Sequence, residues 1–455
     1  MSPNPSRRRT ERRGLQLWPV GIVLTATFTM AVVVAAITFY AGWDLLGARK
    51  LKPEPSIDSK TLFDMVKLSF GVVAGAGALV ALVVAYRRQR VDEAGALRES
   101  TRLHTERFTA AVTQLGDDSA AVRLGGVHAL AGLADDAPTR ALRQTGIDVL
   151  CAYLRLPYVA ESDLPEGDEE ARHTYLALRE VRMTVIRLIR DHLRLPLQHQ
   201  HSWQGHDFDL TEVTFDGGDL SGAQFSGGAV SFSGARFVSA QVRFDGALFT
   251  SGVVSFDWAE FCGHVVRFDG ARFSGGEVTF DGAVFSGGEV RFDGARFSGG
   301  EVTFDGARFS GGEVRFDGAR FSDGEVTFDG ARFSDGEVTF DGAVFSGGEV
   351  TFDGAVFSGG EVRFDGARFS DGEVTFDGAV FSGGEVRFDG AVFSGGEVRF
   401  NRSEFSGATL GFIDPDGPAP FGVLSLGSPP PTGVMVPDEW LSDGPNTDSA
   451  TPPTP

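Results

Sequence analysis

A 12-residue unit recurs almost unchanged through the second half of this 455-residue chain. One copy, Phe268–Thr279, has the sequence Phe-Asp-Gly-Ala-Arg-Phe-Ser-Gly-Gly-Glu-Val-Thr, and further copies continue to Asn401. A unit this short cannot bury its apolar residues alone, so successive copies must stack to build a common core. The repeat therefore predicts a solenoid.

Each unit contains two phenylalanines, and a smaller apolar residue lies two positions before each of them. Ala271 precedes Phe273, and Val278 precedes Phe280. Because residues two apart in extended backbone face the same way, each pair points into the core and the residue between them points outward. The Asp-Gly and Ser-Gly-Gly-Glu segments supply the corners, since Gly adopts positive φ at low cost. The predicted core ladder is Phe268, Phe273, Phe280, Phe285, Phe292, Phe297, Phe304, Phe309, Phe316 and Phe321.

The residue before each Val-side Phe indicates how many residues form one coil. Ten of twelve such positions follow a 24-residue alternation of Arg and Thr, which favours two units per coil over a flat, two-sided coil of 12. Duplication of a 24-residue gene segment is the competing explanation. At the spacing of β-strands, residues 208–412 would form about 8.5 coils and a rod of roughly 40 Å. The predicted outward columns are Arg267, Arg291, Arg315, Arg363 and Arg387, and Thr279, Thr303, Thr327, Thr351 and Thr375.

The start of the repeat region resembles the pentapeptide-repeat family. Phe215, Leu220 and Phe225 are spaced by five, and the stretches 219–223 and 222–225 are similar to that family's motif, with Leu or Phe at its centre. The resemblance implies a mainly β solenoid, a right-handed, four-sided parallel β-helix with one side per repeat. This chain departs from the pattern because every second side carries two extra residues.

The N-terminal region contains two apolar runs, 17–40 and 68–86. Runs of this length can span a bilayer, so the sequence predicts a basic tail at 1–16 and a transmembrane helical hairpin at 17–86. Lys and Arg are more numerous outside the hairpin than in its loop, which predicts a bacterial membrane protein with both termini and the repeats in the cytoplasm. A secretion signal is the alternative interpretation of the first run.

Apolar residues recur at helical spacing through 87–200, which predicts an α-helical domain before the solenoid. Its predicted helices cover about 97–115, 122–133, 139–154 and 169–193. Within this domain, several stretches resemble the helical segment of membrane-anchored actinobacterial pentapeptide-repeat proteins. They are Arg107–Val112, Arg123–Leu130, Asp148–Arg155 and Arg190–Arg194, followed by Phe208–Leu210.

Charge and composition bound the function. The solenoid, predicted at 201–412, holds 34 acidic and 15 basic residues, so its net charge is 15 minus 34, or −19. Such a surface repels phosphate, and we expect no direct nucleic-acid binding. The segment 413–455 is rich in Pro, Gly and Ser and is predicted to be disordered.

No catalytic, cofactor-binding or metal-binding group is predicted. Arg123, His128, Asp148 and His173 lie on helices without the spacing of a catalytic set, so we interpret them as structural. We expect no enzyme activity, no cofactor and no small-molecule substrate. The sequence favours a membrane-tethered scaffold that binds an unknown protein partner, with a DNA-mimicking inhibitor or protector of topoisomerase (gyrase) as the alternative.

Overall fold

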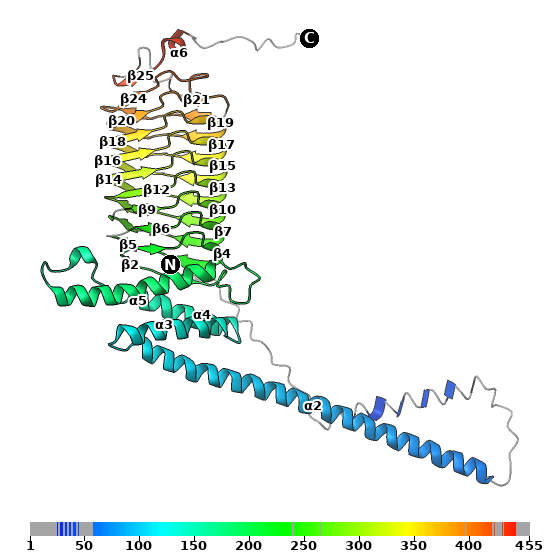
Figure 1. Cartoon of the computed structure of the whole chain (residues 1–455). Helices are drawn as coiled ribbons and strands as arrows, with labels where there is room; N and C mark the ends of the chain where they lie inside the picture. Colours follow the sequence, from blue (N-terminus) through cyan, green and yellow to red (C-terminus); the bar gives the residue numbers. More distant parts are fainter. Residues whose placement is uncertain are drawn as a thin grey trace, which may run out of the picture. The chain divides into compact units, whose positions relative to one another are not determined.

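The structure, a computed structural model, divides into two compact units, Met1–Leu103 and His104–Pro455. It describes residues 58–238, 241–263, 265–395, 397–420 and 432–442, together with residues 423 and 430 and scattered positions between 25 and 44. Figure 1 shows the stacked strands that make up most of the second unit.

Helix α2 (Ser59–Leu115) contains the second of the two apolar runs. Among the described residues, no helix is long and apolar enough to cross a membrane. This finding corrects the predicted pair of transmembrane helices; the first run, 17–40, lies mostly outside the described residues. The prediction relied on the absence of charge in the run 68–86. Three Gly and five Ala in that run dilute its larger apolar side chains, and α2 continues beyond it into a charged segment.

The helices that precede the solenoid lie close to their predicted positions. They are α3 (Ala120–Asp135), α4 (Arg140–Arg155), the short 3₁₀ helix η2 (Glu161–Asp163) and α5 (Glu169–Leu193). The side chain of Thr139 caps α4 by accepting a hydrogen bond from the backbone N–H of Leu142, and Asp168 caps α5 in the same way. Their apolar faces join a core that continues into the first coils.

The solenoid consists of two parallel sheets. The first sheet contains β1 (Phe208–Asp209), β4 (Gln224–Ser231), β7 (Leu248–Ser255), β10 (Arg272–Thr279), β13 (Arg296–Thr303), β15 (Arg320–Thr327), β17 (Val344–Thr351), β19 (Arg368–Thr375), β21 (Val392–Phe393) and β22 (Glu397–Arg399). The second sheet contains β2 (Thr214–Phe215), β3 (Gly218–Asp219), β5 (Arg236–Phe237), β6 (Val242–Arg243), β8 (Glu260–Phe261), β9 (Val265–Arg267), β11 (Val284–Phe285), β12 (Glu289–Arg291), β14 (Arg308–Arg315), β16 (Arg332–Thr339), β18 (Val356–Arg363), β20 (Val380–Arg387), β23 (Glu404–Phe405), β24 (Thr409–Gly411) and β25 (Val434–Met435).

Strand pairing fixes the length of one coil. In the first sheet Phe273 lies opposite Phe297, and in the second sheet Phe285 lies opposite Phe309. Both pairs are 24 residues apart, so the predicted 24-residue coil is confirmed. Register shifts on either side of Ser274 divide the long strand β10 into two rungs. The hydrogen-bonded ladder continues past this corner, which explains why the rungs form two sheets.

The phenylalanines form stacks along the interior of the solenoid. All ten Phe of the predicted core ladder are at most 2% exposed. The Phe316 ring stacks on Phe292 and Phe340, with centroids 4.7 and 4.8 Å away, and meets Phe304 edge to face at 5.9 Å. These separations match the spacing of hydrogen-bonded strands, so ring stacking and backbone pairing reinforce each other.

Glycine is required at the Ser-Gly-Gly-Glu corner. Gly312 has φ of 75°, a region that favours glycine. A Cβ at this position would lie 2.4 Å from the carbonyl oxygen of Gly288 in the preceding coil. Corners of successive coils therefore approach too closely for any side chain at this position.

A polar junction connects the helices to the first coil. The buried Arg182 of α5 donates hydrogen bonds to the backbone oxygens of Leu154 (2.6 Å) and Thr214 (2.8 Å). The carboxylate of Asp216, which is 2% exposed, accepts a hydrogen bond of 2.5 Å from the Tyr175 hydroxyl. Because these groups are buried and paired across the junction, the helices and the first coil form one folding unit.

The far end of the solenoid is also covered. The sequence predicts disorder from residue 413, but β25 pairs with β24, and α6 (Asp438–Ser442) follows it. Trp440 on α6 is 8% exposed and packs against Phe412 and Phe393, with ring centroids 5.3 and 6.1 Å away. The last phenylalanines would otherwise expose apolar faces, and composition alone did not reveal the segment that covers them.

Replacement of one ladder residue tests the energetic role of the Phe stacks. We expect Phe316→Ala to lower the free energy of unfolding by about 3 to 5 kcal/mol, because it leaves a cavity between two stacked rings. Arg308→Ala, at an exposed site, is expected to change it by less than about 0.5 kcal/mol. Urea denaturation followed by circular dichroism measures both, and equal effects of the two substitutions would contradict the model of a Phe-stabilised core.

Candidate interaction surface

Each coil contributes the same outward positions, so outward side chains form columns along the solenoid. Three of these columns carry most of the charge. The ionic network lies on the second sheet and comprises Arg267, Arg291, Arg315, Arg363 and Arg387 with their carboxylate partners. The acidic column lies on the first sheet and comprises Glu277, Glu301, Glu325, Glu349, Glu373 and Glu397. The basic column, also on the first sheet, comprises Arg272, Arg296, Arg320 and Arg368.

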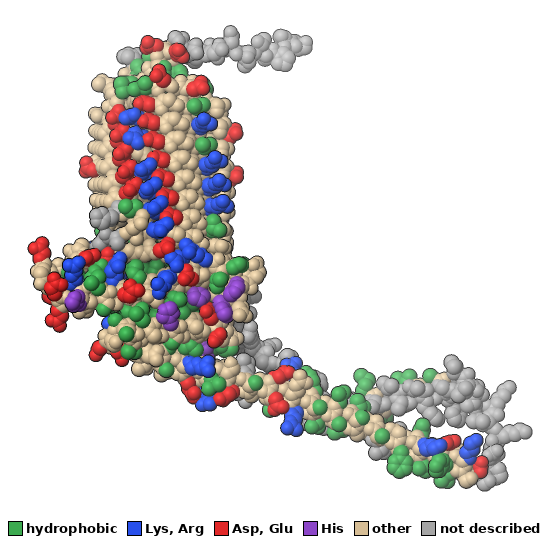
Figure 2. Space-filling model, in the orientation of Figure 1, with side chains coloured by type: hydrophobic (Ala, Val, Ile, Leu, Met, Phe, Trp, Pro, Cys, Tyr) green, Lys and Arg blue, Asp and Glu red, His purple; other side chains and the backbone are tan. Residues whose placement is uncertain are grey.

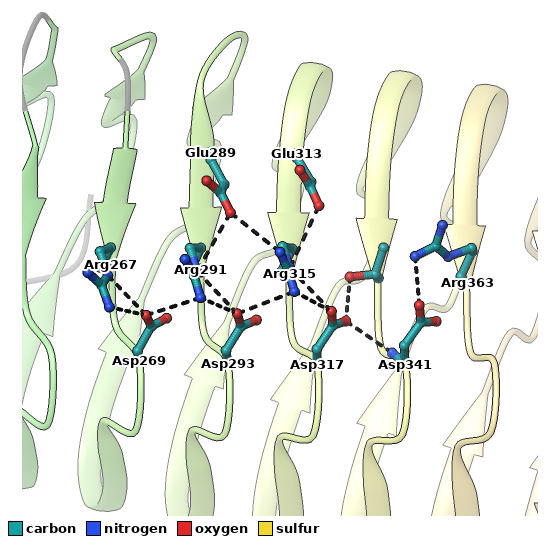
Figure 3. Close-up of polar contacts among 11 residues, drawn as sticks. Arg267, Asp269, Glu289, Arg291, Asp293, Glu313, Arg315, Asp317, Asp341 and Arg363 are labelled. Atoms are coloured by element: carbon teal, nitrogen blue, oxygen red, sulfur yellow. Dashed lines mark hydrogen bonds and ion pairs between the residues drawn. The ribbon is translucent and has the colours of Figure 1, made fainter.

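In the ionic network, each arginine bridges neighbouring coils (Figure 3). The guanidinium of Arg315 lies 2.9 Å from the Asp317 carboxylate of its own coil and 3.6 Å from Asp293 of the preceding coil. It also lies 3.7 Å from Glu289. Its side chain is 31% exposed, so these ion pairs are partly shielded from water. The network therefore neutralises one face of the solenoid and links its coils.

The aspartates after the Val-side phenylalanines are half-buried acceptors. On the first-sheet side, Asp281 accepts hydrogen bonds from the Thr303 hydroxyl (2.5 Å) and the backbone N–H of Asp305 (3.2 Å) in the next coil. Burial raises the pKa of Asp281 above its ordinary value, although these hydrogen bonds act in the opposite direction. Burial also raises the pKa of Asp293, which the hydrogen bond from Arg291 opposes.

The threonine column points outward but is covered. Thr279, Thr303, Thr327, Thr351 and Thr375 are 2 to 8% exposed. The hydroxyls of Thr303 and Thr327 donate to Asp281 and Asp305 of the preceding coil, which lie over them. Sequence reasoning placed these threonines on the free surface because it assigned the aspartates only to the bends. The strict recurrence of Asp after each Val-side Phe was the signal for their second role as acceptors between coils.

The acidic column borders a shallow groove on the first sheet. The groove is lined by Gly300, Glu301, Gly324, Glu325, Gly348, Glu349, Gly372, Glu373 and Glu397. In the part of the chain that the structure describes, no basic group lies within 4.0 Å of Glu277, Glu301, Glu325 or Glu349, and these side chains are exposed. Only Glu373 and Glu397, near the end of the column, approach Arg399. Burial, followed by repulsion from Glu301 and Glu349, raises the pKa of Glu325.

The basic column is equally exposed. Figure 2 shows it as a row of basic side chains beside the mixed charges of the ionic network. Within the described residues, Arg272, Arg296, Arg320 and Arg368 form no ion pair with an acidic group. Val344 takes the place of Arg between Arg320 and Arg368. The first sheet therefore presents one acidic and one basic column, neither of which is neutralised within the chain.

The residues considered for catalysis do not form a recognisable site. His128 and His173 are exposed on different helices, and Asp148 accepts a hydrogen bond of 2.7 Å from Gln144. Among the described residues, no group of three or more His, Cys, Asp or Glu has the arrangement of a metal site.

Comparison with known proteins identifies one family. Residues 210–257 match the family model described as pentapeptide repeats (9 copies). The matched segment covers the first coils, where phenylalanine and leucine are spaced by five, and ends before the near-identical 12-residue units begin. No curated protein and no solved structure matches the chain.

The ionic network makes a prediction about stability and pH. We expect Arg315→Gln to lower the free energy of unfolding at pH 7 by about 1 kcal/mol, because it removes a counter-charge from half-buried Asp293. Losing Arg315 raises the folded-state pKa of Asp293 further. The cost applies while Asp293 is ionised and is relieved as the pH falls through that pKa, where the folded state takes up a proton.

Urea denaturation at pH 7 and pH 4 measures this effect, with Arg308→Gln as the matched control because Arg308 forms no ion pair among the described residues. A loss that is the same at both pH values, or equal for the two variants, would show that the network does not act through charge.

Proposed function

We propose that this chain is a non-enzymatic protein-interaction module that binds a partner through the first sheet of its solenoid. The observation that carries the proposal is the contrast between two rows of glutamate. On the second sheet, Glu337 and Glu361 pair with Arg363 and Arg387 at 2.5 and 3.0 Å. On the first sheet the acidic column has exposed carboxylates without such partners from Glu277 to Glu349.

Unpaired like charges along a column repel one another, which disfavours the isolated molecule. A partner with a complementary basic surface relieves this repulsion on binding. The match to pentapeptide repeats supports an interaction role, because solenoids of stacked repeats present extended binding surfaces. The rigid Phe core holds the carboxylates in fixed positions, so little order is lost on binding.

A second candidate is a DNA mimic that binds a topoisomerase of the gyrase type. Its support is charge density: a net charge of −19 over roughly 40 Å is about one charge per 2 Å, close to one per 1.7 Å in duplex DNA. The ionic network argues against it, because arginines interrupt the acidic field on one face. A supercoiling assay in which excess protein leaves gyrase unaffected would remove this candidate.

The acidic column gives the test of the leading proposal. We expect the triple variant Glu301→Gln, Glu325→Gln and Glu349→Gln to weaken partner binding at least tenfold, because it removes three adjacent charges without changing side-chain shape. Affinity capture from the native cells with the full chain, quantified by mass spectrometry, measures recovery of each partner.

The matched control carries the same three changes on the second sheet, Glu313→Gln, Glu337→Gln and Glu361→Gln, and is expected to retain the partner. Partners retained by the first-sheet variant, or lost equally from both, would overturn the assignment of the binding face.

A further inference from the structure

Both unpaired columns lie on the same strands, on either side of one corner. In β13, Arg296 is the first residue and Glu301 the sixth, with the Ser-Gly-Gly corner between them. The same arrangement occurs in β10 and β15, so three successive coils carry both charges. The first sheet is therefore an unpartnered face whose two halves have opposite charge.

The charges in each column recur once per coil, at the spacing of parallel strands, about 4.8 Å. A partner must have the same spacing to pair with several of them in succession. An extended peptide places side chains of one face roughly 6.6 Å apart and loses register within about three coils. A second copy of this chain has the required spacing in both columns.

We propose that the first sheet binds the first sheet of a second copy, with the two solenoids parallel and in register. This inference deepens the proposed function and rests on it, since it names the partner. A twofold axis parallel to the solenoid exchanges the two sides of the corner but keeps each coil at its level. Arg296 of each copy then faces Glu301 of the other copy. An antiparallel pair would place like charges together.

The second sheet does not offer the same interface. Its exposed arginines, Arg308 and Arg332, occupy the position equivalent to the basic column. Its glutamates, however, already pair with arginines of the ionic network, as Glu337 does with Arg363. The charge complementarity that draws two copies together is therefore confined to the first sheet.

Sedimentation velocity of the full-length chain tests this proposal. We expect a dimer whose dissociation constant rises at least tenfold between about 50 and 500 mM NaCl, because screening weakens exposed ion pairs. Arg296→Glu with Arg320→Glu is expected to weaken the dimer at least tenfold, since symmetry doubles each lost pair. The control, Arg308→Glu with Arg332→Glu, makes the same change in net charge on the second sheet and should leave the dissociation constant within about twofold.

Charge exchange and cross-linking test the geometry. Glu301→Arg with Glu325→Arg should also fail to dimerise alone, yet form a heterodimer when mixed with Arg296→Glu, Arg320→Glu, because opposite charges then face each other on both sides. Ser298→Cys, in a chain with Cys262→Ser, should cross-link two copies through position 298, which lies at the corner on the expected axis.

A wild-type chain that remains monomeric at low salt would overturn the proposal, as would equal loss of dimer in the second-sheet control. If such a monomer still loses its captured partners in the Glu301→Gln, Glu325→Gln, Glu349→Gln variant, self-association alone fails and the proposed function stands. If dimers form but position 298 does not cross-link, the parallel arrangement is wrong.

Discussion

The structure depends on one coincidence of lengths: aromatic rings stack at nearly the spacing of hydrogen-bonded strands. Phe292 and Phe316 have centroids 4.7 Å apart, and their strands are neighbours in the second half of the sheet stack. Backbone pairing and ring stacking therefore favour the same register, 24 residues per coil. A solenoid of this kind gains core contacts with every coil added and needs no long-range fold to specify them.

The core alone does not distinguish a coil of 24 residues from a slip of 12, because both place Phe on Phe. The outward residues remove this ambiguity. With a 24-residue register, Arg291 lies beside Arg315 and both share Asp293, whereas a 12-residue slip would place Arg beside Thr. Half-buried aspartates such as Asp293 would then lose counter-charges at a cost of about 1 to 3 kcal/mol each. Partly buried polar contacts thus specify the register, while the phenylalanines supply most of the stability.

The sequence allowed the inward pairs and the coil length to be predicted because both follow from periodicity. Ala271 and Phe273 share a face for simple geometric reasons, and the alternation of Arg267 with Thr279 reflects which residues become neighbours. Contacts between coils were missed where they involve two different positions of the repeat, as with Thr303 and Asp281. The junction residue Arg182 was missed because its partners are backbone oxygens, which leave no pattern in the sequence.

The first coils differ from the rest, and the difference follows from what they contact. Gly218 lies close to Ile186 of α5, and Gly222 close to the Arg194 side chain, so these coils must fit the helices as well as each other. Their acidic-column positions hold Ala229 and Val253 instead of Glu. From β10 onward each coil contacts mainly its own kind, and the unit becomes nearly uniform. The charged columns are thus confined to the coils beyond the helical junction, which is where a long, regular partner can bind without obstruction by the helices.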